Sequence, residues 1–184
     1  MASVVNFRTV KLAIAVSLLA VLAACASTSI FDYAAAGNTS GVRSTLNKGT
    51  DVNSKDSNGE SALMYAASHG HESTARLLLD KGADVNATDQ NGYTPLMSAC
   101  SGGNANLVLA MINRGANVNA KAKDGTTALL AAAKKGYTFI VDLLLTKGAD
   151  LNARDNSGKT AMTYARESGS QRLIQYLRGL GAPE

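Results

Sequence analysis

Apolar and polar positions along the chain form blocks that recur at a fixed spacing. One short apolar block, such as LMSAC at 96–100, lies between a hydroxyl residue and a glycine. A longer block, such as IVDLLL at 140–145, ends before another glycine. The segments between these pairs, such as 82–93, are rich in Gly, Asp and Asn without helical periodicity, and they indicate extended arms and tight turns. Each pair of apolar blocks predicts two short packed helices.

The landmarks of these blocks repeat every 33 residues, which predicts an internal repeat. The series in phase are Gly59, Gly92, Gly125 and Gly158; Gly37, Gly70, Gly103, Gly136 and Gly169; Gly49, Gly82, Gly115, Gly148 and Gly181; and Asn53, Asn86, Asn119 and Asn152. The hydroxyl residues Thr28, Ser61, Thr94, Thr127 and Thr160 share the phase and are expected to be N-caps of the first helices. The second glycine series is expected to end those helices in the left-handed conformation.

The unit containing TPLMSAC at 94–100, after GADVNATD at 82–89, resembles the ankyrin repeat. The resemblance implies an all-α solenoid of five helix-turn-helix units with short β-turn arms, the first unit being degenerate. The predicted units are 28–56, 57–89, 90–122, 123–155 and 156–184, and the first and last act as caps. We assign the glycines to this repeat rather than to a phosphate-binding loop.

The chain departs from the family pattern at two places in the unit. The usual histidine after TPL is replaced by Met64, Met97, Leu130 and Thr163, so the hydroxyl–imidazole hydrogen bond of the family is expected to be missing. The Asp that opens each turn is Ala122 before the fourth unit, and 119–124 is therefore expected to be the loosest joint.

The N-terminal residues have the pattern of an export signal. Arg8 and Lys11 precede an uncharged segment, 12–24, which as a helix would be about 20 Å long and too short to span a bilayer. It ends in Leu22-Ala23-Ala24-Cys25, which resembles the lipobox of bacterial lipoproteins. The resemblance implies that residues 1–24 are a signal peptide cut before Cys25, with 25–27 as lipid attachment and short linker.

The same resemblance implies a diacylglycerol on the Cys25 thiol and acylation of the new amino group. The alternative is an ordinary signal peptide cut near Ala24. Ala26 stands where an Asp retains such proteins at the inner membrane in enteric bacteria. We therefore expect a cell-envelope protein, lipid-anchored at the outer membrane and facing the periplasm.

Charge and composition exclude several other functions. The net charge is +4, and Arg8 and Lys11 supply part of it, which is too little to indicate nucleic-acid binding. His69 and His71 make a poor metal pair, and no nucleophile triad, phosphate loop or carboxylate pair is evident. We expect no catalytic residues, metal or cofactor. Cys100 falls in phase with Ala67, Ala133 and Arg166, mostly small residues, and is expected to be a buried small hydrophobe, although its redox activity stays open.

The resemblance places the binding surface on the concave side, formed by the turn tips and the first helices. Tyr93 is the aromatic residue at a tip and either anchors a partner or covers the adjacent turn. Lysines, including Lys121, gather on the third and fourth full units, which predicts a partner with an acidic surface; a solvated face is the alternative. The predicted binding residues are Asn58, Glu60, His69, Gln90, Asn91, Tyr93, Ser101, Lys123, Thr126, Lys134, Lys135 and Lys159.

Together these expectations favour a monomeric, membrane-anchored protein that acts by protein–protein binding in the bacterial cell envelope. One alternative is an immunity or inhibitor protein that neutralises a toxin directed to the periplasm. Another is an accessory protein that supports a periplasmic enzyme. The identity of the partner is not encoded in any motif.

Overall fold

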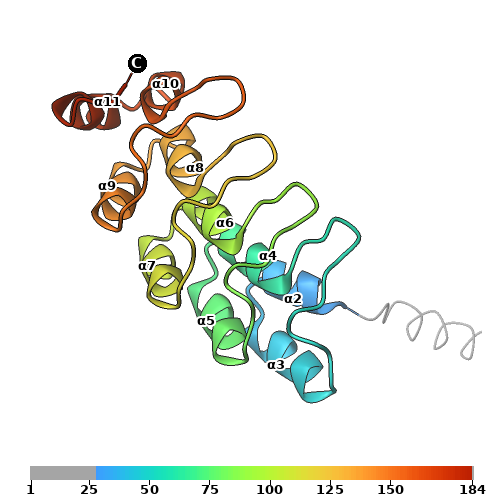
Figure 1. Ribbon diagram of the computed structural model, residues 1–184. Helices are drawn as coiled ribbons and strands as arrows, with labels where there is room; N and C mark the ends of the chain where they lie inside the picture. Colours follow the sequence, from blue (N-terminus) through green and yellow to red (C-terminus); the bar gives the residue numbers. More distant parts are fainter. Residues whose placement is uncertain (1–27, 184) are drawn as a thin grey trace, which may run out of the picture.

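The computed structural model describes residues 28–183 as a stack of helix pairs (Figure 1). An all-α solenoid of five units is confirmed, and within the described range an isolated antiparallel bridge joins Lys55 to Ser61. The helices are α2 (Ile30–Ala35), α3 (Thr39–Asn47), α4 (Ala62–Ser68), α5 (Glu72–Asp80), α6 (Pro95–Gly102), α7 (Ala105–Asn113), α8 (Ala128–Lys134), α9 (Thr138–Thr146), α10 (Ala161–Glu167) and α11 (Gln171–Gly179).

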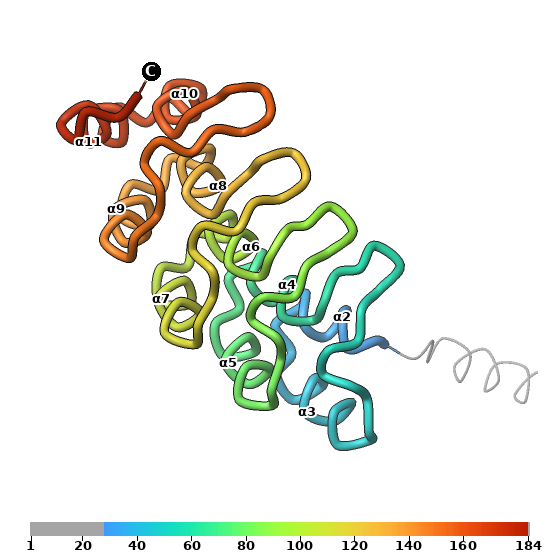
Figure 2. Tube along the Cα trace, in the orientation of Figure 1, coloured from blue at the N-terminus to red at the C-terminus, as the bar shows by residue number. Residues whose placement is uncertain are grey.

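The helices lie in two rows, and the loops between units project from the stack as arms (Figure 2). The first helices α2, α4, α6, α8 and α10 contact one another in sequence, as do the second helices α3, α5, α7, α9 and α11. Figure 1 shows the arms on the side of the first helices. This surface, made of the exposed side of α4, α6, α8 and α10 and the arms, is called the arm face below.

Hydroxyl side chains cap the first helices as predicted, with one exception. The hydroxyls of Ser61, Thr94, Thr127 and Thr160 accept hydrogen bonds from backbone N–H groups three residues later. In the first unit the prediction of Thr28 is wrong, because Ser29 is the N-cap. Hydrogen bonds with Asp32 favour Ser29 as the N-cap. The Asp32 carboxylate accepts from the Ser29 N–H at 2.8 Å and from the Ser29 hydroxyl at 2.7 Å, and the Asp32 N–H donates to the Ser29 hydroxyl oxygen.

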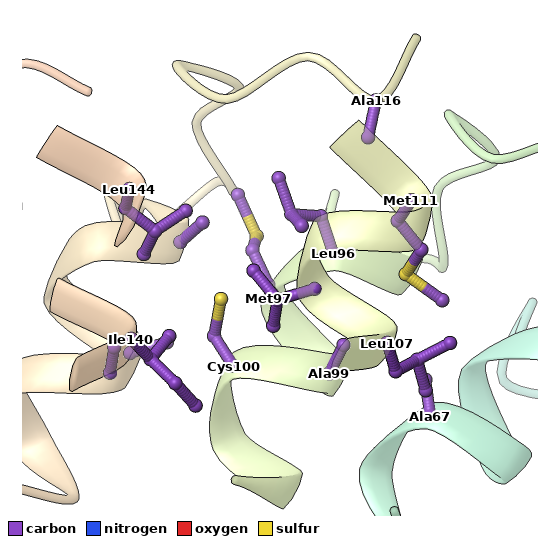
Figure 3. Packing of buried hydrophobic residues seen from close by; sticks show 14 of the residues in the cluster. Ala67, Leu96, Met97, Ala99, Cys100, Leu107, Met111, Ala116, Ile140 and Leu144 are labelled. Atoms are coloured by element: carbon purple, nitrogen blue, oxygen red, sulfur yellow. The ribbon is translucent and has the colours of Figure 1, made fainter. Parts of the chain in front are cut away.

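The hydrophobic core runs through the units without interruption. Figure 3 shows Cys100 of α6 on the side of Ile140 and Leu144, and Ala99 on the side of Ala67 and Leu107. Cys100 is fully buried, as predicted, and burial raises the pKa of its thiol. A thiol that stays protonated and has no contact with solvent is unreactive in the native state.

Asparagine side chains join each arm to the next arm. Asn119 is representative: its Nδ2 donates to the carbonyl of Gly148 at 2.9 Å, and its Oδ1 accepts from the N–H of Asp150 at 2.9 Å. Asn86 and Asn53 make the same pair of bonds one and two units earlier, respectively. Asn152 is in phase with them, but among the described residues its side chain has no such partners. The asparagine series is therefore a set of identical braces between neighbouring units.

Asn119→Ala is expected to lower the free energy of unfolding by about 1–2 kcal/mol, because both of its bonds to the next arm are lost. Asn152→Ala is the matched control and should change it by less than about 0.5 kcal/mol. Urea titration of both variants, followed by far-UV circular dichroism, measures the difference. Equal stability of the two variants would show that the braces contribute nothing to the stack.

The joint at Ala122 keeps the backbone bonds of the other turns. The Ala122 N–H donates to the Thr126 carbonyl at 2.9 Å, as the Asp89 N–H does to Tyr93 at 3.0 Å. The missing carboxylate is partly replaced, because Asp124 Oδ1 accepts from the Thr126 N–H at 2.9 Å. Asp89 Oδ1 accepts two such N–H donors, so the Ala122 turn has one bond fewer. That this joint is the loosest one stays a prediction.

Candidate protein-binding face

The predicted binding residues fall into three groups on the arm face. Gln90, Asn91 and Lys123 lie at the arm tips, where neighbouring arms are hydrogen-bonded to each other. The Gln90 side chain donates to the Ser57 carbonyl at 2.7 Å, and the Lys123 N–H donates to the Asn91 carbonyl at 2.8 Å. The Nε2 group of Gln90 therefore donates within the protein, while the residue stays exposed.

A second group belongs to the first full unit and lies apart from the lysines. Asn58 and His69 are exposed, and Glu60 is half-buried. The His69 ring stacks on that of His71 with 5.9 Å between centroids, and its Nδ1 is 2.9 Å from the Tyr65 carbonyl. These contacts orient His69 within its own unit. Among residues 28–183, no three His, Cys, Asp or Glu side chains are grouped to hold a metal ion.

The third group surrounds a hollow of about 190 Å³ on the arm face, formed by the third to fifth units. Leu130, Ala131 and Tyr164 form part of its lining and were not predicted from the sequence as binding residues. The remaining lining residues are Tyr93, Ser101, Asp124, Thr126, Lys134 and Lys135. Five predicted binding residues thus meet at one place: Tyr93, Ser101, Thr126, Lys134 and Lys135.

The hollow exists because a small residue stands where other units have a tyrosine. Tyr65, Ser98, Ala131 and Tyr164 occupy the same position in successive units. The Tyr65 hydroxyl donates to Asp56 at 2.9 Å, and that of Tyr164 donates to Asp155 at 2.6 Å. The corresponding pair at the fourth unit is Ala122, just before it, and Ala131, so neither the ring nor its carboxylate partner is present.

Tyr93 forms one wall of the hollow by reaching from its own arm to the next. Its hydroxyl donates to Asp124 Oδ2 at 2.6 Å, and the Thr126 hydroxyl donates to the same oxygen at 2.9 Å. Burial and the bond to Asp124 raise the pKa of Tyr93. Although burial acts to raise it, the bonds from Tyr93 and Thr126 lower the pKa of Asp124. Tyr93 thus contacts the adjacent turn through Asp124. Its role as an anchor for a partner stays a prediction.

Lysines surround the ring of Tyr164 at the other wall. The Lys134 Nζ lies 5.9 Å from its centroid and the Lys159 Nζ 5.4 Å, distances at which a cation is attracted by the ring. Lys159 is also paired with Glu167 at 2.7 Å, and this hydrogen bond raises the pKa of Lys159. Lys134 and Lys135 have no carboxylate partner among the described residues. Two uncompensated cations therefore lie beside the hollow.

The predicted anchor and signal peptide cannot be placed on this fold, because Cys25 and residues 1–24 lie outside the described residues. Among residues 28–183, no helix has the length and apolar character needed to cross a membrane.

Two rows of short helices with projecting arms define a helical-repeat protein of the kind that binds other proteins. A family model described as Ankyrin repeats (3 copies) matches residues 30–122 and 103–182. The chain therefore belongs to the ankyrin-repeat family, whose repeats serve protein–protein binding. A search of curated proteins finds no match.

Proposed function

We propose that the protein is a lipid-anchored ankyrin lipoprotein of the bacterial cell envelope that binds another protein through its arm face. The lipobox at Leu22–Cys25 supports the anchor, which we place at the outer membrane on the periplasmic side because Ala26 is not an Asp. The two uncompensated lysines beside the hollow carry the argument for the partner.

The partner in this proposal presents an acidic surface to Lys134 and Lys135. Both lysines are exposed, and neither forms an ion pair with a carboxylate among the described residues. Charges arranged in this way on an interface speed the encounter with an oppositely charged surface and set the orientation of the complex. Tyr93 and Tyr164 supply the rigid aromatic area that interfaces favour, next to these charges.

The anchor also limits where the partner can lie. Helix α2 begins at Ile30, five residues after Cys25, and a fully extended linker of that length reaches roughly 18 Å. The first unit is then held close to the bilayer. The hollow, formed by the third to fifth units, is carried away from the surface by the stack and not by a flexible tether.

Lys134→Glu/Lys135→Glu is expected to weaken association with the partner about tenfold or more at low salt, and less at high salt because the charges are exposed. The partner is first recovered by affinity purification of the anchored protein from host membranes. Titration calorimetry against the recovered partner then compares the variant with the parent protein.

The matched control is Lys81→Glu/Lys147→Glu, which makes the same change in net charge at exposed C-caps of the second-helix row. Its affinity should equal that of the parent. Equal affinity of all three proteins would contradict the acidic-partner proposal. Recovery of a toxin would favour an immunity or inhibitor role, and recovery of a periplasmic enzyme would favour an accessory role.

A further inference from the structure

We propose that the hollow above Ala131 is a specificity pocket for one glutamate side chain of the bound protein. The inference rests on the proposed protein-binding function and assigns the chemistry of its central contact. It begins with the dimensions of the hollow. At about 190 Å³, the hollow is smaller than the roughly 300 Å³ from which small-molecule and cofactor sites begin, and it is suited to one inserted side chain.

The floor and walls of the hollow are apolar or already hydrogen-bonded. Ala131 and Leu130 are buried beneath it, and Tyr164 is 9% exposed. The Tyr93 and Tyr164 hydroxyls are both donated to carboxylates of the protein. Their rings therefore present carbon surface to an incoming side chain, and this surface matches the methylene groups of a flexible stem.

Several hydrogen-bond donors at the rim of the hollow have no acceptor within the described chain and can bind an anion. Lys134 and Lys135 lack a carboxylate partner, and the Ser101 hydroxyl has no hydrogen bond to the rest of the described chain. Asp124 is the one acidic residue of the lining. Because Asp124 Oδ2 accepts from Tyr93 and Thr126 hydroxyls and its Oδ1 from the Thr126 N–H, its charge is already engaged. The free donors at the rim therefore favour a carboxylate.

The combination of an apolar floor and a cationic rim favours glutamate over aspartate. A glutamate has two methylene groups that can lie against the tyrosine rings while its carboxylate reaches Lys134 or Lys135. An aspartate, one methylene shorter, would lose either the ring contact or the charge contact. An aliphatic side chain would fill the floor but leave both lysines unpaired.

The probe for this proposal is a phage-displayed library of random twelve-residue peptides, selected on the full chain purified from membranes in detergent. We expect the enriched peptides to share one glutamate. In the best peptide, Glu→Gln should weaken binding at least tenfold, and Glu→Asp should weaken it severalfold. No enrichment over a blank surface, a recurring aspartate, or equal binding of the Gln peptide would overturn the assignment.

Two variants test whether the hollow is where the glutamate binds. Ala131→Tyr fills it with the side chain that Tyr65 and Tyr164 have at this position, and should lower peptide affinity at least tenfold. Ser98→Tyr is the matched control: it adds the same ring one unit earlier, where Asp89 can accept its hydroxyl, and should retain the preference for glutamate. Circular dichroism and thermal melting confirm that each variant is folded.

Lys134→Ala/Lys135→Ala changes exposed side chains and should fold. It therefore tests the glutamate site even if Ala131→Tyr does not fold. In this variant the Gln and Glu peptides should bind equally. If Ala131→Tyr is folded and binds the Glu peptide as the parent does, the pocket is refuted. The proposed function survives that result if Lys134→Glu/Lys135→Glu still loses the native partner, and fails with it if no lysine variant has an effect.

Discussion

Cys25→Ser is expected to abolish acylation of the protein entirely and to leave residues 1–24 attached to it. A serine hydroxyl is not alkylated by the lipid donor, so neither the diacylglycerol nor the later cleavage is possible. Each buried methylene contributes about 0.8 kcal/mol, and stable anchoring needs more than one chain, so the loss is all or none. Labelling with radioactive palmitate measures the loss of the lipid in the host, and the larger size of the variant on a denaturing gel measures the loss of cleavage.

Cys100→Ala is the control for the anchor, because the units before and after it have Ala67 and Ala133 at this position and the side chain is fully buried. It should be labelled and retained like the parent. A parent protein that is unlabelled and soluble would instead support an ordinary signal peptide cut near Ala24. A Cys25→Ser protein that still incorporates palmitate would contradict lipid attachment at this residue.

Gly102→Val is expected to lower the free energy of unfolding by about 3 kcal/mol, since its side chain would overlap backbone atoms of the neighbouring unit. A Cβ at Gly102 would lie 2.4 Å from the carbonyl oxygen of Ala67 and 2.8 Å from that of Ser68. These atoms belong to α4, so α4 and α6 would have to separate along their contact. Urea titration of the purified variant measures the loss.

Gly179→Val provides the comparison on another helix. Gly179 ends α11, and nothing lies within 4 Å of a Cβ built there. The free energy of unfolding should change by less than about 0.5 kcal/mol, with any change favourable, because valine has a higher helix propensity than glycine. Similar losses in both variants would show that the loss at Gly102 does not come from its close packing against α4.

The 33-residue period predicted the helix pairs, the N-caps and the left-handed glycines because each depends on one residue type at one position. Gly103 at φ +79° is an example of the last. The period did not predict the N-cap correctly where two neighbouring hydroxyl residues could both take that position. Thr28 is in phase, but Asp32 selects Ser29 because its carboxylate can reach that backbone N–H.

Glycines outside the period show the same limit. We assigned the glycines to the repeat, and Gly41, Gly102 and Gly179 do not belong to its series. The units before and after Gly102 have His69 and Lys135 at its position, so a period cannot reveal why a glycine is needed. The reason is the approach of two helix backbones, which depends on packing.

The hollow could not be predicted either, although its signal was in the chain. Comparison of Tyr65 and Tyr164 with Ala131 would have revealed a missing ring on the arm face. The direction of the Tyr93 ring and its bond to Asp124 depend on the distance between arms, which no sequence pattern specifies. Asn58, Glu60 and His69, in contrast, were placed by phase alone, and the structure leaves them apart from this site.

Tyr164 lines the hollow and belongs to the last unit of the stack. Helices α10 and α11 make their substantial contacts with each other and with α8 and α9, so the last unit can fray while the remainder stays folded. Ala131 and Lys134 belong to the fourth unit, but Tyr164 belongs to this last one. A partner side chain in the hollow therefore contacts both the fourth and the last unit and stabilises their packing. Its affinity depends on the fraction of molecules in which the last unit is folded against the fourth.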